Sequence, residues 1–192
     1  MKIGSTLENQ KIEKRIAITP EIAKKYISLG FDVQLSKNYG THLGITDDEY
    51  KKIGVKFLSD EKEIINLSNI IVQLGLLSDD KSSLLKEDQT LIGVLNPYDN
   101  KEKLEVLKDK KIKLFSLELL PRITRAQSMD ILSSQANLAG YKAVIESFAN
   151  FEKAIPMMMT AAGTIPAAKV LVVGAGAVSY THLRAHETVL DL

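Results

Sequence analysis

The chain has 192 residues, of which 45 % are hydrophobic and 26 % charged, with a formal net charge of +1 and no cysteine. This length suits one domain, or one domain and part of another. The near-zero net charge argues against a nucleic-acid-binding protein, which would carry a basic excess. The lack of cysteine excludes disulfides and thiolate metal sites. The first ten residues lack the apolar core of a signal peptide, so an unexported protein is expected.

The first 116 residues alternate short apolar runs with amphipathic charged segments. This alternation favours an α/β fold in which helices flank a parallel, Rossmann-like sheet. We expect an N-terminal α/β domain over residues 1–126. Strands are predicted at residues 2–4, 32–36, 55–58, 69–74, 90–95 and 112–116.

Helix signals lie between these strands. Thr19 followed by Pro20 is typical of an N-cap with proline at the first helical position. Thr46 and Glu49 have the spacing of a capping box, and residues 101–110 are predicted to form an amphipathic helix. The first two of these helices are predicted to end at Gly30 and Gly54.

A long connecting helix is predicted at about residues 127–153, within a connecting segment at 127–155. From Ile131 to Tyr141 no residue is charged. Polar residues nevertheless recur there at steps of three and four, and so share one face of the helix. Such a polar face, which beyond Asp130 carries no charge, is expected to touch a ligand or to be buried against another subunit. Its members are Asp130, Ser133, Ser134, Asn137 and Tyr141.

Arg122 and Arg125 precede this helix, where the positive end of the helix dipole makes cations unfavourable by about 0.3 to 1 kcal/mol. Either a ligand group or a carboxylate of the protein would compensate, and the sequence favours neither. Gln127 has a structural interpretation, since Thr124 and Gln127 fit a capping box. Asp130 likewise suits the first turn of a helix on electrostatic grounds alone.

The sequence VLVVGAGAV follows an irregular stretch containing proline and glycine. A strand is predicted at residues 170–173, followed by a glycine turn at Gly174 and Gly176. This is how a second, nucleotide-binding Rossmann domain begins, with the pyrophosphate at a helix N-terminus. That domain is assigned to residues 156–178 and is incomplete. Residues 179–192 form an anomalous tail, whose His182 and His186 lack further ligands and are not expected to bind a metal.

Three segments resemble the alanine dehydrogenase and pyridine nucleotide transhydrogenase family: ENQKIEKRIAITP, PRITRAQSMDILSSQANLAGYKAV and TAAGTIPAAKVLVVGAGAV. The middle segment is similar to the NAD(H)-binding component of proton-translocating transhydrogenases. Against the dehydrogenase branch, Gln73 stands where that branch has a substrate-binding lysine, and Asn96 stands where it has a catalytic histidine. Arg15, which resembles the dehydrogenase substrate arginine, remains.

The resemblance implies that this chain contributes no catalytic side chain, because hydride passes directly between two nicotinamide rings and the protein positions the dinucleotide. It implies two groups of cofactor-binding residues. Around the nicotinamide and its ribose these are Arg122, Gln127, Asp130 and Ser133. Along the pyrophosphate they are Gly174, Gly176, Ala177 and Val178.

The resemblance also implies NAD(H) as cofactor, NADP(H) on a partner component, a separate membrane-spanning component that translocates protons, and a homodimer. The location expected is cytoplasmic and peripheral to the inner membrane. Because residues 179–192 resemble nothing in the family, the chain is interpreted as a fragment that binds NADH poorly alone. The alternatives are an alanine dehydrogenase-like amino-acid dehydrogenase and a non-catalytic α/β interaction module.

Overall fold

A computed structural model describes residues 1–173 of the chain. Contacts divide the chain into two compact units, Met1–Leu120 and Pro121–Leu192, which are described one at a time. Within the described residues, no helix is long and apolar enough to cross a membrane.

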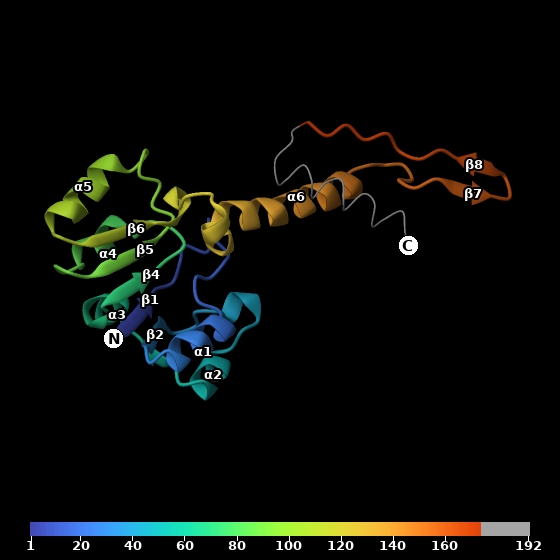
Figure 1. Cartoon of the computed structure of the whole chain (residues 1–192). Helices are drawn as coiled ribbons and strands as arrows, with labels where there is room; N and C mark the ends of the chain where they lie inside the picture. Colours follow the sequence, from blue (N-terminus) through green and yellow to red (C-terminus); the bar gives the residue numbers. More distant parts are fainter. Residues whose placement is uncertain (174–192) are drawn as a thin grey trace. The chain divides into compact units, whose positions relative to one another are not determined.

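The first unit contains a parallel sheet (Figure 1). Among the described residues this sheet has six strands, in the order β3-β2-β1-β4-β5-β6. Each of the six strands predicted within residues 1–116 is confirmed, most of them one to three residues shorter than expected. Such strands are predictable because strands buried on both faces are short apolar runs. Their bounds are β1 Lys2–Ser5, β2 Asp32–Ser36, β3 Lys56–Leu58, β4 Ile70–Val72, β5 Thr90–Gly93 and β6 Lys113–Ser116.

The helices that connect these strands begin and end at recognisable signals. Thr19 caps α1 by accepting a hydrogen bond from the amide of Ile22, and Thr46 and Glu49 form the predicted capping box of α2. Glycines with φ of +86° and +95° follow these two helices, as expected. The helices of this unit are α1 Pro20–Ser28, α2 Asp47–Lys52, α3 Glu61–Leu67, α4 Asp79–Ser83 and α5 Lys101–Asp109, with 3-10 turns at Thr41–Leu43 and Leu117–Leu119.

Helices cover both faces of the sheet, because side chains alternate along each strand. Ile3 of β1 packs in a core cluster with Ala23 of α1 and Tyr50 of α2. The next residue, Gly4, faces α3, and a Cβ placed there would lie 2.1 Å from Ser68 Oγ. Glycine therefore permits the close approach of α3 to the centre of the sheet. A second cluster joins the side chains of α3 and α5 to β4 and β5.

The second unit differs from the sequence prediction at the start of its long helix and after its end. A 3-10 helix at Thr124–Met129 precedes α6, which spans Ile131–Ala149 rather than 127–153. The N-cap of α6 is Asp130, not Thr124, because the Asp130 carboxylate accepts a hydrogen bond from the amide of Ser133. The predicted first helical turn is therefore a 3-10 segment.

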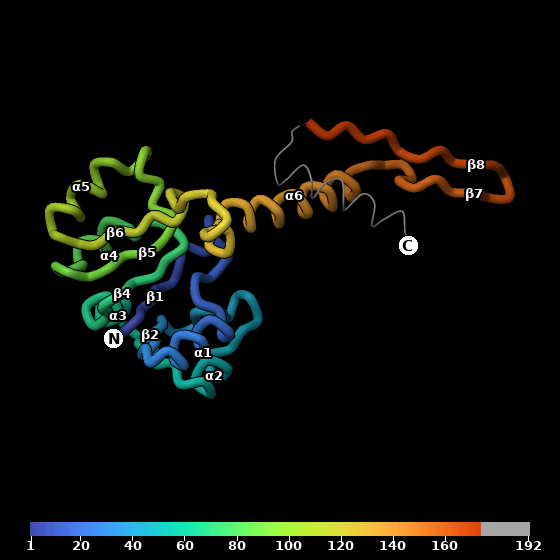
Figure 2. The backbone as a smooth tube through the Cα atoms, in the orientation of Figure 1, coloured from blue at the N-terminus to red at the C-terminus, as the bar shows by residue number. Residues whose placement is uncertain are grey.

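The remaining differences concern the residues after α6. The stretch expected to be irregular contains an antiparallel hairpin of β7, Met158–Thr160, and β8, Gly163–Ile165 (Figure 2). The strand predicted at residues 170–173 is absent from the described part of the chain. A strand needs a neighbouring strand to satisfy its backbone groups, and among residues 1–173 none pairs with this run, whose Leu171 is 88 % exposed.

Candidate functional site

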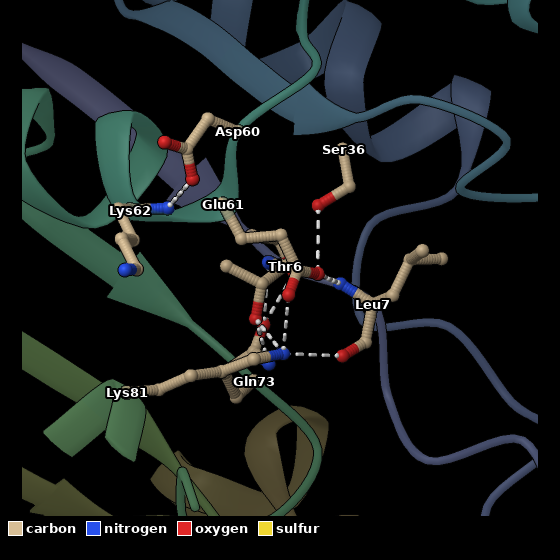
Figure 3. A network of polar contacts seen from close by, with 9 residues as sticks. Thr6, Leu7, Ser36, Asp60, Glu61, Lys62, Gln73 and Lys81 are labelled. Carbon is tan, nitrogen blue, oxygen red and sulfur yellow. Dashed lines mark hydrogen bonds and ion pairs between the residues drawn. The ribbon is translucent and has the colours of Figure 1, made fainter.

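Polar side chains gather where β1, β2 and β4 end, at the carboxyl edge of the sheet (Figure 3). Gln73, which directly follows β4, is 4 % exposed. Its Oε1 atom accepts hydrogen bonds from Ser5 Oγ at 2.7 Å and from the amide of Thr6 at 3.0 Å. Its Nε2 atom donates to Thr6 Oγ1 at 3.0 Å. The side-chain amide of Gln73 thus joins the ends of two adjacent strands, and both acceptor positions of its oxygen are used by the protein itself.

Glu61 and Lys81 form an ion pair next to this amide, with 2.9 Å between Lys81 Nζ and Glu61 Oε2. Lys81 also donates to the carbonyl of Leu7 and to Thr6 Oγ1. Glu61 Oε1 accepts from the amide of Leu7 and from Ser36 Oγ (Figure 3). The pair therefore holds both backbone groups of Leu7 and fixes the start of the loop that follows β1.

The hydroxyl of Tyr39 holds the far end of the same loop. It lies 2.8 Å from Ser5 Oγ and accepts from the amides of Ala17 and Ile18 at 3.1 and 3.2 Å. Tyr39 is 1 % exposed, and burial raises the pKa of its phenol. The loop between Leu7 and Ala17 is consequently held at both ends by hydrogen bonds.

A pocket of about 450 Å³ opens beside the polar network. Glu8 is one of its lining residues and accepts a hydrogen bond from the amide of Leu74 at 2.7 Å. Burial raises the pKa of the Glu8 carboxyl, although the amides of Leu74 and Gly75 oppose the shift. The other lining residues are Leu7, Asn9, Glu61, Gln73, Leu76, Leu77, Ser78 and Lys81.

Besides Gln73, two other residues singled out by comparison with the dehydrogenases lie in the first unit. Arg15 donates from Nε to Glu13 Oε1 at 2.9 Å and pairs with Glu13 Oε2 at 2.6 Å. The pairing lowers the pKa of Glu13. Asn96 has a φ of +46°, and its backbone amide donates to Glu118 Oε1 at 2.5 Å.

Within the second unit, three of the predicted nicotinamide-site residues lie together. Ser133 donates to Asp130 twice, from its amide to Oδ1 at 2.9 Å and from Oγ to Oδ2 at 2.7 Å. These bonds lower the pKa of Asp130, and the nearby positive charge of Arg122 lowers it further. A carboxylate of the protein thus offsets part of the charge of Arg122, which is one of the two compensations that the sequence allows.

The other predicted site residues are less informative. Gln127 is exposed in the 3-10 helix and contributes its carbonyl to the amide of Asp130. The polar face of α6 remains accessible, with Tyr141 56 % exposed. The predicted pyrophosphate-binding residues Gly174, Gly176, Ala177 and Val178 lie outside the described residues, as do His182 and His186.

Sequence reasoning missed Glu8, Tyr39, Glu61 and Lys81, whose partners lie 20 to 75 residues away along the chain. A partial signal was available, because Thr6 lies two residues after the strand predicted at residues 2–4 and Gln73 lies near the end of the strand predicted at residues 69–74; in the structure each directly follows a strand, β1 or β4. Polar residues at that position collect at the carboxyl edge of a parallel sheet, where α/β proteins bind ligands.

The strand order places the pocket between the ends of β1 and β4, where the chain changes its direction of winding across the sheet. This geometry defines a doubly wound, Rossmann-type α/β domain with a cleft at its topological switch point. The family model described as "Alanine dehydrogenase/PNT, N-terminal domain" matches residues 5–139, and the corresponding C-terminal domain model matches residues 143–188. The chain therefore belongs to the alanine dehydrogenase and pyridine nucleotide transhydrogenase family. The second match includes most of the segment predicted to be an anomalous tail.

The chain is similar to several transhydrogenase subunits. It is 46 % identical to the first part of the NAD(P) transhydrogenase alpha subunit of Rickettsia prowazekii, over 92 % of this chain and 47 % of that protein. The corresponding protein of Rhodospirillum rubrum is 43 % identical with the same coverage. The crystal structure of a transhydrogenase from Sinorhizobium meliloti superposes with a TM-score of 0.91 at 38 % identity, covering 99 % of this chain and 57 % of that one. The chain spans about half the length of the curated relatives it matches.

Proposed function

We propose that this chain is the NAD(H)-binding component of a proton-translocating NAD(P)+ transhydrogenase. The observation that carries the proposal is the 46 % identity to a transhydrogenase alpha subunit across 92 % of the chain. In this function hydride passes between NADH held here and NADP+ held by a partner component. A membrane-spanning partner couples the transfer to proton movement. The chain itself is peripheral to the inner membrane, on the cytoplasmic side, and forms a homodimer.

The residues of the second unit fit one end of such a cofactor. Arg122 and Gln127 are exposed and offer donors that suit a carboxamide or ribose oxygen. Asp130 offers charged acceptor oxygens, and Ser133 fixes their orientation. NAD(H) supplies the hydride, while these side chains hold and orient the nicotinamide and its ribose. Gly174, Gly176, Ala177 and Val178 would lie along the pyrophosphate.

The geometry of the first unit argues against amino-acid dehydrogenation. Such a reaction needs groups that bind a carboxylate and exchange a proton with the substrate. Gln73 is hydrogen-bonded to Ser5 and Thr6, and the guanidinium of Arg15 is paired with Glu13. Asn96, with an amide side chain, is no proton donor at neutral pH.

The test uses a chimera in which residues 1–173 are followed by the remainder of the Rhodospirillum rubrum relative. We expect NADH to bind this protein in a calorimetric titration. Arg122→Ala should lower the affinity by about tenfold, since a hydrogen bond from a charged group contributes about 1.5 to 3 kcal/mol. Arg125→Ala is the matched control, because Arg125 is also exposed in the same segment and should leave the affinity unchanged.

If the chimera binds no NADH although it is folded, the proposal is wrong. If Arg122→Ala and Asp130→Asn both leave NADH affinity unchanged, the predicted nicotinamide site is wrong. That second result would favour the interpretation of this segment as an interaction surface.

A further inference from the structure

Three of the five methionines of the chain are consecutive, Met157, Met158 and Met159, and the last two belong to β7. All three side chains are exposed, Met159 to 84 % and Met158 to 46 %. An exposed thioether is open to attack by peroxides, which convert methionine into its polar sulfoxide. The hairpin therefore presents a cluster of oxidisable side chains to solvent.

Met158 has a second feature, because it lies directly opposite Ile165 of β8 in the antiparallel ladder. Side chains that lie opposite each other on one face are the unit that stabilises paired strands. Met159 points to the other face, since side chains alternate along a strand, and its partner is the polar Thr164. Among the three described pairs of this hairpin, Met158–Ile165 is the one in which both side chains are apolar.

The hairpin is closed near its turn and again at its base. Thr160 Oγ1 donates to the carbonyl of Gly163 at 2.9 Å, and the amide of Ala168 donates to the carbonyl of Ile155 at 2.9 Å. A lone two-stranded hairpin is marginally stable in water, so the loss of one apolar pair shifts the balance towards the open form. Pairing of β7 with β8 therefore limits how far the chain reaches between its two ends at residues 155 and 168.

We propose that Met158 is a redox-sensitive residue, whose oxidation to the sulfoxide opens the hairpin of β7 and β8. In this step the thioether sulfur gives up two electrons and takes one oxygen atom from hydrogen peroxide, which leaves as water. The sulfoxide oxygen requires hydrogen bonds from water, so the apolar pairing with Ile165 is lost. Oxidation of Met159, on the other face, leaves that pairing intact. The proposal does not depend on NAD(H) binding.

The experiment treats the 192-residue chain with hydrogen peroxide and locates the sulfoxides by peptide mass spectrometry. Met159 should be oxidised before Met158, because its side chain is the more exposed. Strand pairing is followed through hydrogen exchange of the Ala168 amide, which closes the base of the hairpin. This amide should exchange up to about fivefold faster once Met158 is oxidised, which is the largest effect expected from one cross-strand pair.

Substitutions separate the loss of this pair from general oxidative damage. Met158→Leu keeps an apolar side chain without a sulfur, so its Ala168 amide should not respond to peroxide. Met158→Gln introduces a polar side chain of similar length and should accelerate exchange without peroxide. Met159→Leu is the matched control, because it removes the neighbouring sulfur and should respond to peroxide as the unchanged chain does.

Three results would overturn the proposal. The first is an equal response to peroxide in Met158→Leu and in the unchanged chain, and the second is a response that disappears in Met159→Leu. The third is a cluster that resists peroxide while the exposed Met129 is oxidised, because the three sulfurs would then be covered.

A repair experiment on the unchanged chain needs no substitution, and so keeps the proposal testable if a variant does not fold. Methionine sulfoxide reductases return the sulfoxide to the thioether. Treatment of the oxidised chain with these enzymes should restore the slow exchange of the Ala168 amide. Fast exchange that persists after Met158 is repaired would contradict the proposal.

Discussion

A single buried hydroxyl organises the start of this fold. Tyr39, from the loop after β2, contacts Ser5 at the end of β1 and the amides of Ala17 and Ile18 just before α1. Three segments that are separate in the sequence thus meet at one oxygen atom. Because buried donors without a partner are costly, the hydroxyl supports the closure of the loop that carries Glu8.

We predict that Tyr39→Phe lowers the free energy of unfolding by about 1 to 3 kcal/mol, because the two amides and Ser5 lose their shared partner while remaining buried. Urea denaturation followed by circular dichroism measures the change. Tyr98→Phe serves as control, since Tyr98 is 88 % exposed and its replacement should have no measurable effect. An unchanged midpoint for Tyr39→Phe would show that water replaces the lost contacts.

The sequence identified some site residues and missed others for a physical reason. Asp130 and Ser133 are three residues apart on one helix, so local spacing brings them into contact. Glu8 meets Leu74, and Glu61 meets Leu7, only after the sheet has assembled. Spacing along the sequence does not predict such contacts. Resemblance to the family drew attention to Arg15 and Gln73 but not to their internal partners.

The start of α6 depends on a single side chain, that of Asp130. Its first residues are Ile131, Leu132 and Ser133, none of which is acidic, so Asp130 supplies both the cap and the negative charge that the helix dipole favours. The sequence prediction began the helix too early. It assigned Thr124 as the cap, although aspartate at the true boundary caps more strongly than threonine.

Because the N-cap of α6 is a carboxylate, we predict that the first turn of this helix depends on pH. The pKa of Asp130 is lower in the folded protein than in the unfolded chain, where an aspartate titrates at about 3.9. The contribution of the cap is therefore fully present above that value and is lost as the pH falls through the lower, folded pKa. Carbon-13 shifts of Leu132 and Ser133 should report the loss of helix over this range.

Asp130→Asn provides the matched comparison for the cap. Asparagine caps helices about as well as aspartate but does not titrate, so the helix start should persist and show no acid transition. If the carbon-13 shifts of Asp130→Asn change over the same pH range as those of the unchanged chain, a different group controls the end of α6.

At the scale of the molecule, the two units differ in how much apolar surface they bury. Each cluster of core side chains is built from residues within the first 120. In the second unit, the residues of β7 and β8 are all exposed, as are Leu138 and Tyr141 of α6. The parallel sheet was predictable because its strands are apolar and short. The isolated hairpin was not, since its sequence lacks a strong turn signal.

This difference predicts that the first unit folds on its own and that the described part of the second unit does not. A fragment of residues 1–120 should unfold in urea in a single cooperative step, because it contains both core clusters. A fragment of residues 121–173 should be largely unfolded by circular dichroism, because an exposed helix and a lone hairpin are marginal in water. A non-cooperative transition of the first fragment would show that its sheet requires contacts from the second unit.

The position of β1 has a consequence for biosynthesis. The strand made first by the ribosome lies inside the sheet and pairs on one side with β2 and on the other with β4. Its second partner is not synthesised until residue 70, and the edge strand β6 only at residue 113. Parallel sheets form through such distant pairings and are slow to assemble. The edge of β1 that pairs with β4 therefore stays unpaired throughout much of the synthesis, which is when a chaperone would matter most.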